Sequence, residues 1–174
     1  MAADSVHPDY EASARVWARA RDVLAGEDAV KGAGEKYLPK LDAQSDEEYA
    51  AYKARASFFG ATARTLEEFL DLVFRRTPTV SLPDGAVLAK FSNDCDGWGT
   101  GLVQYARRVL AEVLSVGRVG SLVLWDAVAG QPRVSAWRAE QVLDWSVERI
   151  AGSTVLTEVV LKHGEERWVL RLVG

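Results

Sequence analysis

The change from helical to extended structure falls within residues 109–125, VLAEVLSVGRVGSLVLW. Apolar residues recur every three or four positions as far as Leu114, which is the spacing of an amphipathic helix. Gly117 is well suited to end that helix, because glycine readily caps helix C-termini. From Val119 to Trp125 the sequence is instead a dense apolar run, typical of a strand. This stretch therefore predicts helices before Gly117 and strands after it.

Two further helices are expected upstream. The spacing of apolar residues predicts one at Tyr10–Leu24 and a second that begins after Ser45. Ser45 and Glu48 have the spacing of a capping box, in which the serine hydroxyl accepts from a backbone amide and the glutamate reaches back. We expect the second helix to break and restart between Gly60 and Thr65.

Helix-breaking residues and helix-capping residues mark the boundaries of these helices. Residues 30–44 are punctuated by glycine and proline and are predicted to be a loop with extended pieces. Thr65 and Glu68 repeat the spacing of a capping box, which would restart the second helix. Residues 81–101 are predicted to be irregular until Thr100 caps the last helix.

After Gly117 the sequence predicts strands. The apolar strand at Val119–Trp125 leads through a turn to a shorter strand at residues 133–137. Residues 139–145 are expected to form a helical turn or loop. A final hairpin follows, in which alternating apolar residues on either side of residues 162–166 face each other.

The order of these elements predicts the fold class α+β. Helices come first and antiparallel strands follow, whereas an α/β fold would alternate the two. The chain of 174 residues has the length of one domain. We therefore predict a single domain over residues 1–174, with 1–116 mainly helical and 117–174 mainly β.

Composition limits the classes of function. The chain is 48% hydrophobic and 26% charged, the balance of a soluble globular protein. Its formal net charge of -4 offers no basic excess for gripping a phosphate backbone, so DNA is expected to make contact only in loose passage. No apolar run reaches the roughly 18–20 residues of a membrane span, so no membrane partner is expected. The single cysteine, Cys95, excludes an internal disulfide.

No set of residues predicts catalysis. The two histidines, His7 and His163, lie at opposite ends of the sequence, and one cysteine with two distant histidines is too few for a zinc site. The loop SNDCDGWGTG resembles part of a calcium loop. With Gly97 at the sixth position, however, Ser92 and Val103 take the two end positions, where carboxylates are needed. We therefore expect no metal, no cofactor and no enzymatic activity.

Six tryptophans are many for a chain of this length. Core filling is one reason for them, since aromatic side chains dominate burial. Contact between subunits is the other, because tryptophan is enriched at interfaces. Four tryptophans of the strand-rich part are the candidates for a subunit interface: Trp125, Trp137, Trp145 and Trp168.

Three separated segments resemble a phage protein family that is catalogued as a domain of unknown function and associated with portal proteins. Residues 30–78 contain a glycine-flanked YLP segment, a YxxYKxRA helix, an ATART segment and an LVFR end before proline. Residues 96–125 are similar to the family's DGxGTSLxxFAR helix and GRxGxLVD strand. Residues 138–162 resemble the motif that precedes a hairpin. The resemblance covers Val30 to Leu170, in the family's order.

The resemblance implies a virion structural protein. Portal subunits form a ring, usually of twelve copies, at one capsid vertex, through which DNA is packaged and ejected. The implied partners are copies of the same chain, the capsid, the terminase and head-completion proteins. The implied location is the virion, with the host cytoplasm during assembly. No cofactor is implied.

The resemblance covers only the N-terminal part of such a subunit. Family members continue with the stem and clip regions beyond the point that corresponds to Gly174, so this chain is expected to be a portal-like wing and core fragment. The alternative is a stand-alone adaptor or prophage remnant derived from a portal protein. Such an adaptor would add a strand to a partner through its C-terminal hairpin.

Overall fold

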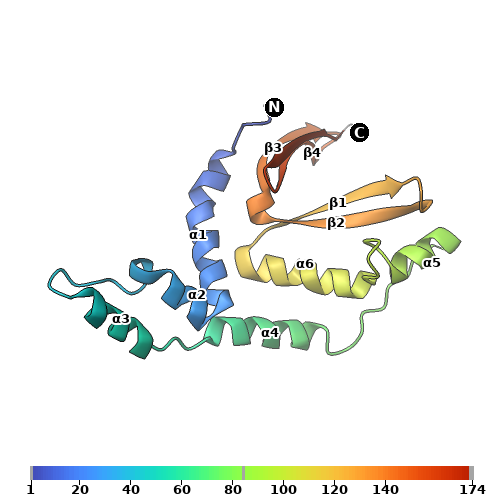
Figure 1. Cartoon of the computed structure of the whole chain (residues 1–174). Helices are drawn as coiled ribbons and strands as arrows, with labels where there is room; N and C mark the ends of the chain where they lie inside the picture. Colours follow the sequence, from blue (N-terminus) through green and yellow to red (C-terminus); the bar gives the residue numbers. More distant parts are fainter. Residues whose placement is uncertain (1, 84, 173–174) are drawn as a thin grey trace.

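A computed structural model describes residues 2–83 and 85–172 of the chain. Helices occupy the N-terminal part and strands the C-terminal part, so the predicted α+β class is confirmed (Figure 1). The helices are α1 (Pro8–Ala25), α2 (Glu27–Gly32), the 3-10 helix η1 (Gly34–Lys36), α3 (Asp46–Arg55), α4 (Ala61–Val73), α5 (Ala86–Asn93) and α6 (Leu102–Val116). The strands are β1 (Val119–Asp126), β2 (Gln131–Arg138), β3 (Val142–Ile150), β4 (Ser153–His163) and β5 (Glu166–Arg171), with the 3-10 helix η2 (Ala139–Gln141) between β2 and β3.

The strands form two antiparallel sheets. β1 and β2 make a separate hairpin, and β3, β4 and β5 make a three-stranded meander. The predicted final hairpin is β4–β5, in which Val159 lies opposite Leu170 and Leu161 opposite Trp168. The predicted loop at residues 139–145 is wrong in its second half, because β3 begins at Val142. Pairing with β4 makes that stretch a strand, and such pairing is not visible in local sequence.

The capping box of the second helix is confirmed. The Glu48 amide donates to the Ser45 hydroxyl at 3.2 Å, and the Ser45 amide donates to the Glu48 carboxylate at 2.9 Å. The helix nevertheless ends at Arg55, earlier than predicted, and α4 begins at Ala61 without a capping side chain. The break at residues 56–60 places Phe58 beside α1 and α2, where it lines a shared cavity with Val23 and Val30.

Four other details of the helices differ from the predictions. Thr65 lies inside α4 and caps nothing, because the helix has already begun four residues earlier. Gly101, and not Thr100, is the N-cap residue of α6. α5 lies within the stretch predicted to be irregular, and α2 covers the start of residues 30–44. Gly117 ends α6 in the left-handed conformation, as predicted.

Two small apolar clusters lie in the core of the described chain, beside buried residues such as Trp17, Leu70 and Val160 that belong to neither cluster. The first joins α5, α6 and β2 through the buried Cys95, Tyr105 and Val134. The second lies between the β1–β2 hairpin and the meander, around Trp137, Val159 and Leu161. Since each cluster has only three buried members, neither is large enough to fix the helices relative to both sheets by packing alone.

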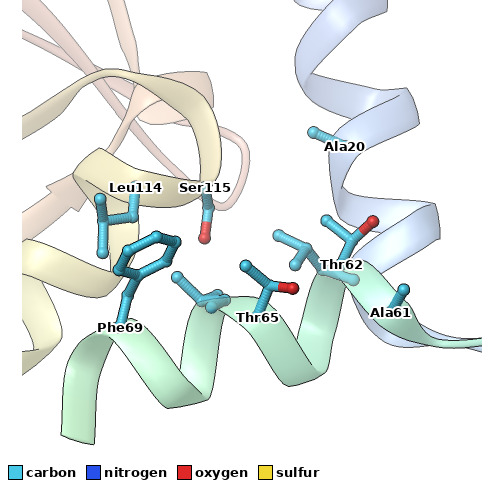
Figure 2. A pocket seen from close by; sticks show the side chains of 9 residues that line it. Ala20, Ala61, Thr62, Thr65, Phe69, Leu114 and Ser115 are labelled. Atoms are coloured by element: carbon cyan, nitrogen blue, oxygen red, sulfur yellow. The ribbon is translucent and has the colours of Figure 1, made fainter. Parts of the chain in front are cut away.

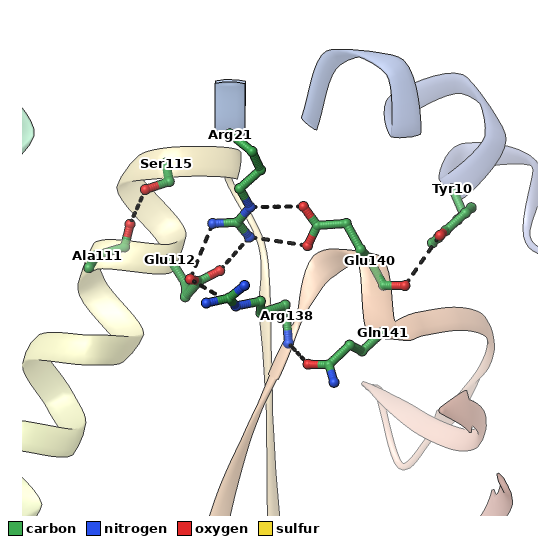
Figure 3. A network of polar contacts seen from close by, with 8 residues as sticks. All are labelled: Tyr10, Arg21, Ala111, Glu112, Ser115, Arg138, Glu140 and Gln141. Atoms are coloured by element: carbon green, nitrogen blue, oxygen red, sulfur yellow. Dashed lines mark hydrogen bonds and ion pairs between the residues drawn. The ribbon is translucent and has the colours of Figure 1, made fainter. Parts of the chain in front are cut away.

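Polar contacts of Arg21 join the helical part to the strands (Figure 3). Its guanidinium, on α1, donates to Glu112 of α6 at 2.6 and 3.2 Å and to Glu140 of η2 at 2.9 and 3.1 Å. The hydrogen bond to Glu140 is the main reason that the pKa of Arg21 is raised. Arg138 approaches Glu112 at 3.7 Å from the end of β2. One guanidinium therefore bridges three elements that are far apart in sequence.

Replacement of Arg21 by methionine is predicted to destabilise the fold. The substitution keeps the apolar stem but leaves Glu112 and Glu140 facing each other without their shared cation. Charged hydrogen bonds of this kind contribute about 1.5–3 kcal/mol, so we expect a loss of about 2 kcal/mol in the free energy of unfolding, measured by urea titration at pH 7.

The matched control is Arg19→Met, which removes a charge from the exposed side of the same helix. Burial raises the pKa of Glu140, but its contacts with Arg21 outweigh this and lower it below the usual 4.5. The contribution of Glu140 is therefore complete above pH 4.5 and lost as the pH falls through the lowered value. The deficit of Arg21→Met should shrink in acid, and equal losses in both variants would contradict this role for Arg21.

Candidate interaction surfaces

Trp137 and Trp168 pack against each other at the end of the strand region. Trp137 is only 7% exposed, within the second apolar cluster, whereas Trp168 on β5 is 42% exposed. Their rings meet edge to face at 5.8 Å, and His163 stacks on Trp168 at 6.0 Å. Trp137 thus contributes to packing within the chain, while part of the Trp168 ring is open to solvent.

Trp145 also contacts the N-terminal part of its own chain. The His7 ring stacks on it at 3.8 Å, and the Arg118 guanidinium lies 4.0 Å from its ring centroid. Arg118 also lies 5.3 Å from the ring of Trp17, and burial lowers the pKa of its guanidinium. The His7 amide donates to the Leu143 carbonyl, which ties the start of α1 to β3. This half-buried cluster holds the N-terminal end of α1 against β3, with Trp145 at its centre.

Trp125 lies near the tip of the β1–β2 hairpin and is 64% exposed. Val123 and Leu124 beside it, and Val128 in the turn, are exposed as well. Of the four tryptophans proposed for a subunit interface, Trp125 is therefore the most accessible. Its role there stays a prediction.

Trp98 is 92% exposed and was not among the four candidates. It projects from the loop between α5 and α6. Hydrogen bonds from the loop's own backbone amides to two carboxylates hold this loop in place. Asp94 accepts from the amides of Gly97 and Gly99, and Asp96 accepts from those of Trp98 and Thr100. The acidic residues that resemble a calcium loop thus bind backbone amides. A large apolar ring on a fixed loop is the usual form of an interface anchor.

A groove of about 420 Å³ lies between α1, α4 and α6 (Figure 2). Leu24, Leu66, Phe69 and Leu114 give it a mainly apolar lining. On α4, Phe69 is followed by Leu72 and Val73, which are also exposed. The sequence pattern identified α4 as amphipathic, but it did not show that the apolar side would be only partly covered.

A second groove, of about 540 Å³, runs between β1 and the meander. Five consecutive residues of β1, Val119–Val123, form one side of it. Apolar side chains of β4, among them Leu156 and Leu161, form the other. The second apolar cluster therefore closes only part of the space between the two sheets.

The accessible surface of the whole chain is large for its mass. It measures 11785 Å². A compact monomer of 19.1 kDa is expected to expose about 8,400 Å². The excess of roughly 3,400 Å² is several times the ~800 Å² that one partner buries in a standard protein interface. Such an open arrangement leaves room for more than one contact with other chains.

Among residues 2–83 and 85–172, no three His, Cys, Asp or Glu side chains are grouped so that they could hold a metal ion. None of the helices in this described part is both long and apolar enough to cross a membrane. Cys95 is fully buried, and burial raises the pKa of its thiol.

Comparisons with known proteins give no assignment. No protein-family model matches the chain, and no curated protein is significantly similar to it in sequence.

The two glycines beside Trp98 allow a test of how closely Arg133 packs against this loop. Gly97 and Gly99 both have φ of 84°, but a Cβ on Gly97 would lie 1.0 Å from the Arg133 guanidinium, whereas one on Gly99 would meet nothing within 4 Å. Arg133 is ion-paired with Asp126 and cannot move without losing that contact.

Replacement of Gly97 by alanine should therefore cost more stability than replacement of Gly99. Both substitutions strain the backbone by about 1 kcal/mol. Gly97→Ala should add about 1 kcal/mol for the displaced Arg133–Asp126 pair, measured by urea unfolding. Equal losses would show that Arg133 can turn away from a side chain at position 97 at no cost.

Proposed function

We propose that this chain is the capsid-side part of a portal-like structural subunit, which assembles with copies of itself into a ring. The resemblance of residues 30–78, 96–125 and 138–162 to the portal-associated family supports this function. In this proposal the ring lies at a capsid vertex and surrounds the path of DNA. The terminase and head-completion proteins are its further partners, and it has no catalytic role.

The observation that supports assembly most strongly is the open shape of the chain. Its excess of accessible surface includes large apolar side chains that an isolated monomer would leave in water. Isolated apolar residues on a surface are ordinary, but contiguous patches mark interaction sites. Leu72 and Val73 next to the α1–α4–α6 groove form one such patch, and Val123 and Trp125, which share one face of β1, form another.

The two patches lie on different sides of the molecule, on α4 and on β1 (Figure 1). A contact that joins two different surfaces is heterologous, and repetition of it closes a ring when the rotation per subunit divides a full turn. Two distinct patches on one chain are therefore what a ring-forming subunit requires.

A stand-alone adaptor is the second candidate, because β5 lies at the edge of the meander and offers a strand for pairing. It would bind one partner protein and would not form rings.

Sedimentation velocity and negative-stain electron microscopy of the purified chain distinguish the two candidates. A portal-like subunit should sediment as larger species with increasing concentration and give closed rings. A chain that stays monomeric up to millimolar concentration would contradict self-assembly and favour the adaptor.

A substitution on α4 tests whether its patch is part of the contact. Leu72→Lys places a charge on an exposed position, so the monomer should fold normally while self-association weakens about tenfold. Leu41→Lys is the control, because Leu41 is equally exposed but lies in the loop before α3. Equal association of the two variants would exclude the α4 patch.

A further inference from the structure

The outer edge of β1 carries backbone groups that have no partner among the described residues. On the far side of β2, the Val134 amide donates to the Cys95 carbonyl at 2.7 Å, so Val134 directs its backbone groups away from β1. Val123 lies opposite Val134. Paired residues of an antiparallel ladder point their groups either both inward or both outward, so the N–H and C=O of Val123 point away from β2.

The same alternation applies along the strand. Ser121 and Trp125 each lie two residues from Val123, so their backbone groups also point outward. Trp125 lies opposite Pro132, which has no N–H to place in a ladder. In the described part of the chain β1 pairs only with β2, and no other backbone group bonds to these three residues. The edge is thus a free template for another strand.

The free edge is also one side of the 540 Å³ groove. The groove follows β1 over Val119–Val123, and apolar side chains of β4 face it. None of the residues that line it is charged. A strand in this groove would bond to β1 through its backbone and place alternate side chains against β4, so it should be uncharged and partly apolar.

Charges distinguish this edge from the edge that β5 gives to the meander. Residues 119–125 contain no charged side chain, whereas β5, at the edge of the meander, carries Glu166, Arg167 and Arg171. Charged side chains are one means by which proteins prevent strand addition at an edge. β1 lacks this protection, which makes it the better site for pairing.

The chain itself contains a segment with the required chemistry. Thr77–Pro83, TPTVSLP, joins α4 to α5 without regular structure and is largely exposed. It has no charged residue, and polar and apolar residues alternate from Thr79 to Leu82. Pro78 and Pro83, which cannot donate to a ladder, bound this stretch. Four residues of strand span about 13 Å, which fits within the roughly 17 Å of Val119–Val123.

The segment and the groove of one chain lie apart. Thr77–Pro83 runs past the ends of α4 and α5, whereas the groove lies beyond α6, between β1 and the meander (Figure 1). Both ends of the segment are held. Arg107 of α6 binds Glu67 and Asp71 of α4, and Phe91 of α5 packs on the first apolar cluster. In this structure the segment does not reach the groove of its own chain, so it could enter only the groove of another copy.

We propose that Thr77–Pro83 of one copy adds as a strand to the free edge of β1 in the next copy. This proposal rests on the self-assembly proposed above and names its contact. The segment and the edge are different surfaces, so the contact is heterologous and can repeat around a ring.

Two lysine substitutions test the contact from its two sides. Val123→Lys charges the edge and Val80→Lys charges the segment. Their side chains are 61% and 44% exposed, so each monomer should keep its fold, checked by circular dichroism and thermal melting. Val128→Lys is the control, because Val128 is exposed in the β1–β2 turn, outside both surfaces.

Sedimentation velocity should show that Val123→Lys and Val80→Lys each weaken self-association at least about tenfold, while Val128→Lys leaves it unchanged. A mixture of the first two should form 1:1 dimers with the affinity of the original chain, because the intact segment of one meets the intact edge of the other. The mixture should not assemble further.

Assembly that both substitutions leave unchanged would overturn the strand-addition contact and leave self-assembly standing. Two weakened variants that fail to complement each other would also overturn it. An original chain that stays monomeric would overturn self-assembly and this contact together.

Discussion

The arrangement of this chain depends on the guanidinium of Arg21. From α1 this side chain binds Glu112 of α6 and Glu140 of η2 at once, next to the start of β3. Partial burial strengthens such contacts, because fewer water molecules compete for the carboxylates. The stack of His7, Trp145 and Arg118 adds a second connection. Ion pairs and ring stacking thus hold α1 against the strand-rich part, where a compact domain would use a single large apolar core.

A fold held in this way leaves apolar surface uncovered. Each of its two apolar clusters is small, and the grooves beside them are lined with side chains that could have closed a larger core. For a monomer this would be a liability, since uncovered edges and patches promote aggregation. For a subunit with neighbours on two sides it is a requirement. The portal-like function that we propose gives a reason for both the openness and the separate patches.

The sequence predicted those features that depend on neighbouring residues. The capping box at Ser45, the end of α6 at Gly117 and the β4–β5 hairpin all follow from local spacing. A break before α4 was predicted too, but its position at residues 56–60 and the start of β3 were not, because distant packing and strand pairing determine them. The same limit applies to the interaction surfaces. Counting tryptophans could not separate buried Trp137 from exposed Trp125, and Trp98 was missed because the candidates were confined to the strand-rich part.

The central claim is that other copies of the chain cover surface that is open in this structure. Amide hydrogen exchange, resolved by residue in the monomeric and assembled protein, measures this most directly. The amides of Ser121 and Val123 should exchange rapidly in the monomer and become protected on assembly, while the amide of Val128, which donates to the Asp126 carboxylate within the turn, should exchange at the same rate in both states. Rapid exchange at Ser121 and Val123 in both states would contradict the account.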